Sequence, residues 1–321
     1  MLENIIIYKN FLECRPDSYK EWYQQGQALQ DLRRYREAIA CYEKAIEYQP
    51  ASYWAWYKKG YCLDQIRYYL EAIDSFDRAL KIRPKDYWAW YRRANSCINS
   101  RNYPAAIASY DAALKIKPQD YWAWYRRAGA CEEINLYEEA ILSYKKALEI
   151  RPGDYWVFYR QGNIYTKLSQ YKEAITSYNQ ALAIRPNDYW AWYHHADILR
   201  QLKIYHSALV SYNKALEIKP GDYWALYRLG EILQELGRYQ EAITSFAQIL
   251  KKDPKDEFSW YHQACCYAQL GNVQEAITTL QEAININPIK FLALTATNSD
   301  FDKIRQNQQF IKAIEQLSNS N

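Results

Sequence analysis

The sequence contains few of the residues from which enzymes build active sites. Its 321 residues include four histidines and nine glycines, and no glycine-rich phosphate-binding loop occurs. His194 and His195 are adjacent, so on a helix their side chains point about 100° apart and do not converge on a metal ion. The seven cysteines form no CxxC pair. We therefore expect a protein that is not an enzyme and that holds no metal and no cofactor.

Long apolar runs and strong net charge are also missing. No stretch approaches the roughly 18 apolar residues of a membrane-spanning helix, so no membrane span is expected. The N-terminus carries acids beside a short apolar run, unlike a signal peptide. The odd, scattered cysteines indicate reduced thiols and a cytoplasmic location. A formal net charge of +4 is too small to indicate a nucleic-acid or membrane partner by itself.

Proline and aromatic residues, by contrast, follow a strict period. Nine of the ten prolines are spaced 34 residues apart: Pro16, Pro50, Pro84, Pro118, Pro152, Pro186, Pro220, Pro254 and Pro288. A fixed period of this length indicates a repeat array. If each proline is position 32 of its unit, eight units result: 19–52, 53–86, 87–120, 121–154, 155–188, 189–222, 223–256 and 257–290. Many of the 33 tyrosines and 12 tryptophans recur at fixed positions of this period.

Each unit predicts two amphipathic helices. Position 20 is Ala in all eight units, position 8 is Gly or Ala, position 4 is Trp in six, and position 24 is Tyr or Phe in seven. Positions 4, 8 and 11 share one helical face, as do positions 17, 20, 24 and 27. Proline at position 32 ends the second helix, and Asp at position 34 suits the N-cap of the next first helix. We expect an all-α fold.

The W-x₃-G/A…Y…A-x₃-Y/F-x₂-A-x₄-P pattern resembles the tetratricopeptide repeat. The segment PGDYWALYRLGEILQELGRYQEAITSF at 220–246 is similar to the long arrays common in cyanobacteria. The resemblance implies a right-handed superhelical solenoid of antiparallel helix pairs, whose first helices line a concave groove with positions 2, 5, 9, 12 and 13. Family members that belong to enzymes carry an additional catalytic domain, and we expect none in this chain.

The resemblance also suggests how the array ends. Residues 1–18 align as an unaccompanied second helix and predict an N-terminal capping helix, whose run Ile5-Ile6-Ile7 offers a weak homodimer contact. Residues 291–321 leave the repeat pattern and predict a C-terminal helical cap. Within this cap, we expect Asp300 or Ser299 to be the N-cap of a helix that contains Phe301 and Ile304.

Aromatic and basic residues remain after the core positions are assigned, and they define the candidate binding site. Position 2 lies nearly opposite the buried stripe, and position 6 follows it by one turn, within reach of a cation–π contact. Position 9 varies along a constant frame, which makes it the candidate specificity position. The predicted groove residues are Trp54, Trp88, Trp122, Trp156, Trp190, Trp224, Tyr57, Tyr91, Tyr125, Tyr159, Tyr193, Arg92, Arg126, Arg160, Asn163 and Asp197. We expect a non-catalytic scaffold that binds a peptide or protein segment along them.

Two alternatives stay open at this point. The tryptophans at position 2 and the tyrosines at position 1 could instead pack on the preceding second helix or on the tryptophan of the next repeat, as an internal ladder. Single-stranded RNA could stack on alternating Trp, Tyr and Arg side chains. Acidic residues at positions 12 and 13, such as Glu132 and Glu235, make nucleic acid the less favoured ligand. The family's carboxylate clamp needs Lys at position 5, where this chain has Tyr, so a clamp of that kind is not expected. The sequence identifies no particular partner.

Overall fold

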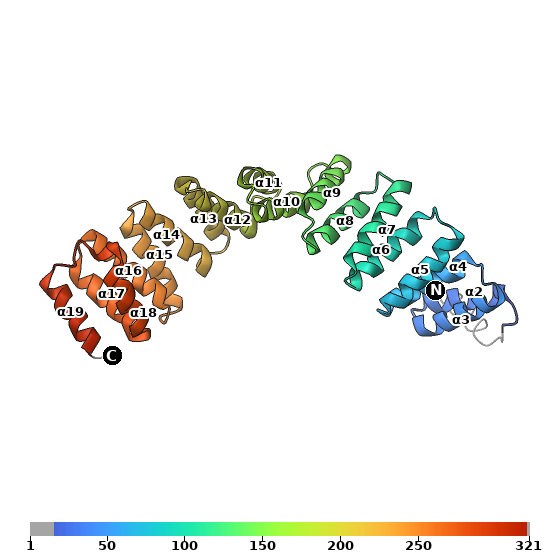
Figure 1. Ribbon diagram of the computed structural model, residues 1–321, viewed down its shortest axis with the longest axis horizontal. Coiled ribbons are helices and arrows are strands. Elements are labelled where there is room, and N and C mark those ends of the chain that lie inside the picture. The colour runs from blue at the N-terminus through green and yellow to red at the C-terminus, as the bar shows by residue number, and fades with distance from the viewer. Residues whose placement is uncertain (1–15, 320–321) are drawn as a thin grey trace. The chain divides into compact units, whose positions relative to one another are not determined.

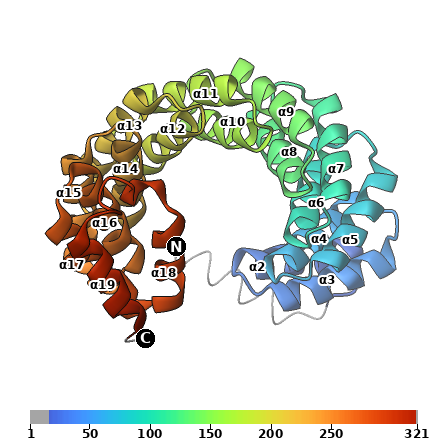
Figure 2. The same ribbon diagram turned by 60° about the vertical axis from the view of Figure 1, so that its left-hand side comes forward.

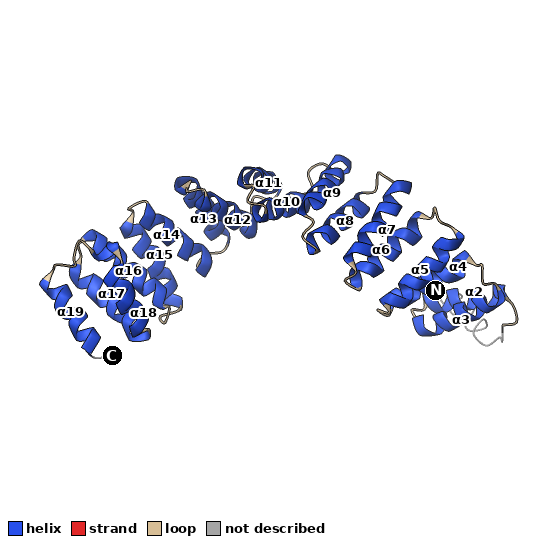
Figure 3. Ribbon diagram, viewed as in Figure 1, coloured by secondary structure: helices blue, strands red, loops and turns tan. Residues whose placement is uncertain are grey.

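The computed structural model describes residues 16–319, which form helices joined by short turns and contain no strand (Figures 1 and 3). The first helices of the pairs are α2 (Tyr19–Asp31), α4 (Tyr53–Gln65), α6 (Tyr87–Asn99), α8 (Tyr121–Glu133), α10 (Tyr155–Lys167), α12 (Tyr189–Gln201), α14 (Tyr223–Glu235) and α16 (Glu257–Leu270). The second helices are α3 (Tyr35–Tyr48), α5 (Tyr69–Ile82), α7 (Tyr103–Ile116), α9 (Tyr137–Ile150), α11 (Tyr171–Ile184), α13 (Tyr205–Ile218), α15 (Tyr239–Lys252) and α17 (Val273–Ile286). The expectation of an all-α array of helix pairs is confirmed.

The helices form two compact units, the first ending at Val157 and the second beginning at Phe158. Within each unit, first and second helices of a pair pack together, and each pair packs on the next. Figure 2 shows that the first helices of a unit lie along one face and the second helices along the opposite face. The predicted capping helix at 1–18 and the homodimer contact at Ile5-Ile6-Ile7 fall on residues 1–15, outside the described part, and stay predictions.

Repeated side chains fix the start of each first helix. The carboxylate at position 34 accepts a hydrogen bond from the backbone N–H of position 3 in the next unit, as in Ala89 N to Asp86 Oδ1 at 2.8 Å. This bond satisfies a donor that would otherwise be unpaired at the helix N-terminus. The hydroxyl of the position-1 tyrosine donates to the same carboxylate group, for example Tyr121 to Asp154 at 2.9 Å. The N-cap residue thereby also joins two successive repeats.

The turn between the two helices of a pair has a left-handed residue at position 15. Its φ is about +60° to +80° in every unit, yet only two of the eight residues are glycine. The set is Arg33, Arg67, Arg101, Asn135, Ser169, Lys203, Gly237 and Gly271. The sequence pattern does not indicate a left-handed residue at this position, because six of the eight residues are not glycine.

The period's proline contributes a carbonyl as well as a helix stop. The indole Nε1–H of the position-4 tryptophan donates to it, as in Trp90 to the oxygen of Pro84 at 2.8 Å and Trp124 to that of Pro118 at 2.8 Å. Position 4 therefore connects the first helix to the preceding loop, and its ring is only partly buried.

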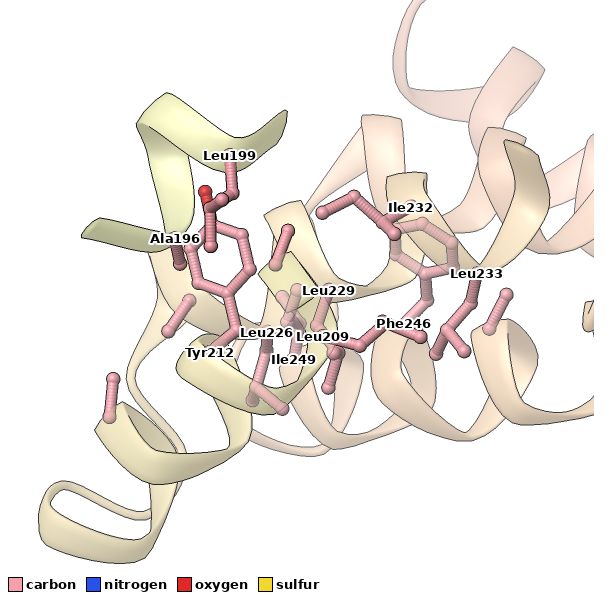
Figure 4. Close-up of a cluster of buried hydrophobic side chains, with 14 of the residues drawn as sticks. Ala196, Leu199, Leu209, Tyr212, Leu226, Leu229, Ile232, Leu233, Phe246 and Ile249 are labelled. Carbon is pink, nitrogen blue, oxygen red and sulfur yellow. The ribbon is translucent and has the colours of Figure 1, made fainter. Parts of the chain in front are cut away.

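The core of seven of the eight pairs is an aromatic ring at position 24, packed against the small residue at position 8. Phe246 and Tyr212 are fully buried, and Figure 4 shows them in the same cluster of the C-terminal unit. Gly230 lies so close that a Cβ atom would come within 2.5 Å of the Phe246 ring. The alanines at position 20 have no exposed surface at all. These contacts explain why positions 8, 20 and 24 accept so few residue types.

The C-terminal segment differs from the prediction. It forms α18 (Pro288–Thr297), the short 3₁₀ turn η1 (Ser299–Phe301) and α19 (Gln308–Asn319). The predicted helix capped by Asp300 or Ser299 is wrong, because the Asn298 side chain caps η1 and turns follow it. The tight turns bring Phe301 and Ile304 into one buried cluster with Phe310. Burying both apolar side chains against the last repeat outweighs a continuous helix there.

Candidate functional site

The tryptophans at position 2 are among the most exposed large apolar side chains of the molecule. Between 46% and 58% of their surface is accessible, whereas the position-24 rings are fully or almost fully buried. We call the four in the N-terminal unit the tryptophan row: Trp54, Trp88, Trp122 and Trp156. The C-terminal unit has Trp190, Trp224 and Phe258 at the same position. Such exposure of a repeated tryptophan is unusual for packing residues.

The ring contacts of the row are made within the repeat. Trp88 meets the edges of Tyr87 and Tyr91 at centroid distances of 5.1 and 6.1 Å. Trp54 and Trp122 contact the tyrosines at positions 1 and 5 in the same way. Among the described residues, none of these three rings stacks on another tryptophan. Their indole N–H groups have no hydrogen-bond partner among the described residues, unlike those at position 4.

A cation does lie over the row, but from a different position than predicted. The guanidinium of Arg83, at position 31, is 4.5 Å from the Tyr53 ring and 5.5 Å from the Trp54 ring. Arg151 covers Tyr121 and Trp122 at 4.1 and 5.5 Å. The expected contact from position 6 is not seen in these repeats. The spacing of residues along the first helix could not identify position 31 as the source of this cation. Position 31 lies at the end of the second helix, and only the packing of the two helices brings it to the ring at position 2.

The residues at position 6 instead connect successive repeats. The Arg92 guanidinium lies 5.0 Å from the ring of Tyr61 in the preceding repeat. In the C-terminal unit, the His262 ring stacks on Phe246 at 5.2 Å, and its Nε2 is hydrogen-bonded to the hydroxyl of Tyr227 at 2.9 Å. Arg126 and Arg160 are exposed. Position 6 therefore has a packing role that the sequence pattern alone did not reveal.

The tyrosines at position 5 are also engaged within the fold. Each of the five predicted ones meets the position-24 ring of its own repeat edge-on, at 5.7 to 5.9 Å: Tyr57, Tyr91, Tyr125, Tyr159 and Tyr193. Burial raises the pKa of Tyr57, Tyr159 and Tyr193 above its ordinary value. These side chains form the wall between the buried core and the exposed tryptophans.

The predicted specificity residues at position 9 accept hydrogen bonds from the core. The buried hydroxyl of Tyr178 donates to Asn163, and that of Tyr212 donates to Asp197 at 3.3 Å. Where position 9 is Gly129, the carboxylate of Glu132 at position 12 accepts instead, from Tyr144 at 2.8 Å. A buried hydroxyl needs such an acceptor. The signal was present in the sequence, because every unit with Tyr at position 24 has an acceptor at position 9 or 12.

A cavity of about 450 Å³ opens in the C-terminal unit. Helices α12, α13, α14, α15 and α16 line it together with the segment around η1. Its polar residues include Arg200, Glu231, Gln234, Glu235, His262 and Asp300. Because Asn298 and Asp300 come from the non-repeating end of the chain, the period could not predict this cavity.

Burial shifts the pKa of several titratable groups in the described part. Burial lowers the pKa of His195 to about 4, so this side chain is neutral near pH 7. Burial raises the pKa of the Cys41 thiol to about 11 and that of Cys62 to about 12, which leaves little reactive thiolate. No group of three or more His, Cys, Asp or Glu residues between 16 and 319 could hold a metal ion. Among the same residues, none of the helices has the length and apolarity that a membrane span needs.

Comparison with known sequences places the repeats. Tetratricopeptide repeat profiles match residues 23–87, 89–155 and 143–176, and a TPR repeat profile matches 162–199. Residues 205–283 match the profile of anaphase-promoting complex, cyclosome, subunit 3. No curated protein sequence matches the chain significantly.

Solved structures show the same architecture. YrrB, described as a TPR protein with an unusual peptide-binding site, is 28% identical, with a TM-score of 0.53 over 60% of this chain and 98% of its own. MamA is 22% identical, with a TM-score of 0.50 over 53% of this chain and 92% of its own. The C-terminal part of a TPR repeat-containing protein from Cytophaga hutchinsonii is 16% identical, with a TM-score of 0.53 over 88% and 100%. By its repeats and its fold, the chain belongs to the tetratricopeptide repeat family.

Proposed function

We propose that this protein is a non-catalytic scaffold that binds a peptide or an extended protein segment on its exposed tryptophans. The family and the similarity to YrrB, itself a peptide-binding TPR protein, support an interaction scaffold in general. The observation that carries the finer proposal is the half-exposed tryptophan row, with indole N–H groups at Trp54, Trp88 and Trp122 that the fold leaves without acceptors.

Each of these side chains keeps apolar surface that a partner can still bury. The exposed half of a tryptophan is on the order of 100 Å², and its burial by a partner contributes roughly 2 to 3 kcal/mol. Tryptophan is also among the residues that dominate binding energy in protein interfaces. A ligand that covers several such rings therefore gains a large part of its binding energy from them.

The mode of recognition follows from the secondary structure. The tryptophans lie on helices, whose backbone N–H and C=O groups are hydrogen-bonded to one another. The surface around the tryptophan row therefore offers no strand edge to which a partner could add a β-strand. A bound segment must therefore use side-chain contacts and accept hydrogen bonds from the indole N–H groups through its own carbonyls. The cations at position 31 lie over the rings of positions 1 and 2 and hold them in place.

The test replaces the row without disturbing the core. Ligand peptides are selected from a displayed library with the purified wild-type protein, and their Kd is measured for the Trp54→Ala/Trp88→Ala/Trp122→Ala variant. We expect at least a hundredfold weakening while the helical circular dichroism is retained. The matched control is Leu70→Ala/Leu142→Ala, because these side chains are 70% and 61% exposed on second helices of the same unit.

Three outcomes would count against the proposal. The triple variant could keep wild-type affinity, or it could lose its fold, which would make the row a packing element. In a third outcome, material co-precipitated from the native host would be lost on nuclease treatment, and an oligouridylate RNA would bind in a way that depends on Trp88. That result would favour RNA as the ligand instead.

A further inference from the structure

We propose that the cavity in the C-terminal unit binds the cationic head of an arginine or lysine side chain on the partner segment. This inference rests on the proposed peptide-binding function and names the side chain that the C-terminal unit selects. The cavity holds about 450 Å³, within the size range of ligand pockets.

Tyrosine rings and acids from different elements enclose the space. Tyr205 comes from α13, Tyr239 from α15 and Tyr261 from α16. Glu231 and Glu235 come from α14, and Asp300 lies in η1. Aromatic rings and carboxylates in one cavity are the groups that hold a guanidinium or an ammonium ion.

Internal partners neutralise the other charges of the cavity. Arg200 forms an ion pair with Asp197 at 3.0 Å, and Glu231 forms one with Arg228 at 2.8 Å. Both ring nitrogens of His262 are occupied, by Tyr227 and Gln234, and burial lowers its pKa, so the ring is neutral near pH 7. Neither pair nor the histidine contributes net charge.

Two carboxylates remain without a cation. Among the described residues, the side-chain groups that donate hydrogen bonds to the Asp300 carboxylate are neutral and include Gln269 and Asn298. Glu235 has no hydrogen bond and no ion pair with any residue of the described part. The cations of the C-terminal segment bind other groups, since Lys303 donates to the carbonyl of Gln269 and Arg305 pairs with Asp302. The cavity therefore presents two carboxylates that no cation of the described part contacts directly.

The same two positions are hydrogen-bonded to each other in some other repeats. In the N-terminal unit the hydroxyl of Tyr103, at position 17, donates to Glu133 at position 13 of the next repeat, at 3.4 Å. Tyr239 makes the equivalent bond to Gln269 at 3.5 Å. The corresponding pair, Tyr205 and Glu235, makes no such bond, although both side chains line the cavity. A hydroxyl and a carboxylate are thus left open on its wall.

Burial raises the pKa of Tyr239 above its ordinary value, and the charges of Asp300 and Glu235 raise it further. Asp300 and Glu235 therefore lie close enough to Tyr239 to act on the same group. A cation entering the cavity is attracted by the carboxylates and contacts the tyrosine rings, whereas an anion is repelled by both.

The test uses N-acetyl-arginine amide as the probe and the citrulline compound, its neutral isostere, as the comparison. Binding is followed through the methyl resonance of Ile232, which lines the cavity and is almost fully buried. We expect the arginine compound to shift this resonance with at least tenfold higher affinity than citrulline. Glu235→Gln should weaken the arginine compound at least fivefold. Glu235 is exposed and unpaired, so this change leaves the fold intact.

The matched control is Glu133→Gln, the same position in the N-terminal unit, which should leave the Ile232 response unchanged. Equal binding of arginine and citrulline compounds would overturn the proposal, and so would a Glu235→Gln variant with wild-type affinity. The triple tryptophan variant should bind the probe normally. If the tryptophan row does not bind the partner, the peptide Kd of the triple variant shows it. If the cavity does not bind a cation, the measurement with N-acetyl-arginine amide shows it, so the two proposals can fail separately.

Discussion

The two units of the chain use the same frame but differ in charge at position 7 of the repeat. This position is basic in three of the four repeats of the N-terminal unit, with Gln25 as the exception, and neutral in all four repeats of the C-terminal unit. In the N-terminal unit, Arg93 and Arg127 each bridge an aspartate of the preceding second helix and a serine of their own repeat. In the C-terminal unit the position is held by neutral side chains: Gln161, His195, Leu229 and Gln263. His195 is hydrogen-bonded to Ser211 at 3.0 Å, and Gln263 donates to the carbonyl of Ile243.

The comparison shows which repeat positions the fold restricts to one kind of side chain and which it leaves variable. Alanine at position 20, a large apolar side chain at position 24 and proline at position 32 are common to both units. Position 7 accepts an ion pair, a neutral hydrogen bond or an apolar side chain. All four histidines lie beyond residue 157, so histidine titration is confined to the C-terminal unit.

The largest expected effect tests the shared frame. Tyr110→Ala in the N-terminal unit and Phe246→Ala in the C-terminal unit each remove a fully buried ring. We expect each to lower the free energy of unfolding by about 3 to 5 kcal/mol, measured by urea denaturation. A cost below about 1 kcal/mol in either unit would mean that the two cores are not equivalent.

Acid should act more strongly on the C-terminal unit through His195. Burial lowers the pKa of His195 from 6.5 to about 4. Between these values the unfolded chain binds a proton that the folded chain does not, so this histidine's contribution to stability is lost as the pH falls. The loss is about 3 kcal/mol near pH 4.

The chain offers the matched control for this effect. His195→Gln places at position 7 the residue found there at Gln161 and Gln263. The variant should match wild-type stability at pH 7 and become relatively more stable as the pH falls from 6.5 to 4. Hydrogen exchange by mass spectrometry should locate the difference in α12 and α13. Parallel pH profiles for both proteins would contradict the shifted pKa.

A smaller effect is expected from the ion pair of the N-terminal unit. Arg127→Leu introduces the apolar side chain that occupies position 7 at Leu229. It removes a 2.6 Å ion pair with Asp111, whose carboxylate is 42% exposed and becomes solvated. We expect a loss of about 1 to 2 kcal/mol. A double-mutant cycle with Asp111→Asn measures the pair itself, and a coupling energy near zero would show that Arg127 acts by packing alone.

The smallest effect concerns the left-handed turn. Arg101→Gly should stabilise the protein by about 0.5 to 1 kcal/mol, because glycine adopts positive φ without strain. Gly237→Ala should destabilise it by a similar amount, since its added Cβ meets no neighbour and only the backbone is affected. The thermal midpoint of each variant measures the change. Shifts of the same sign in both would contradict the explanation.

The sequence predicted the helix pairs well because their determinants are local and periodic. Positions 8, 20 and 24 face one another within a pair, so their spacing alone indicates the core. The hydrogen bond from Trp90 to Pro84 joins neighbouring repeats, and the one from Tyr121 to Asp154 joins the two ends of one repeat, so no helical spacing reveals either bond. The predicted tryptophans lie at the surface, as expected of a binding site.

The rest of the candidate site was harder to predict. Asn163 and Asp197 varied against a constant frame, yet each accepts a hydrogen bond from a buried tyrosine, so variation alone did not distinguish a ligand contact from an internal acceptor. The cavity beside Glu235 depends on Asn298 and Asp300, which follow the last repeat and have no counterpart in the period. A repeat pattern predicts contacts between repeats, but not the contacts that residues after the last repeat make with them.

The central claim is that the tryptophan row binds a partner and does little for the fold. The most direct measurement compares stability and affinity for Trp88→Ala alone, using a library-selected peptide. We predict a loss of about 2 kcal/mol or less in unfolding free energy, together with at least a tenfold increase in Kd. A loss above about 3 kcal/mol with unchanged Kd would show that Trp88 belongs to the structure, and would contradict the claim.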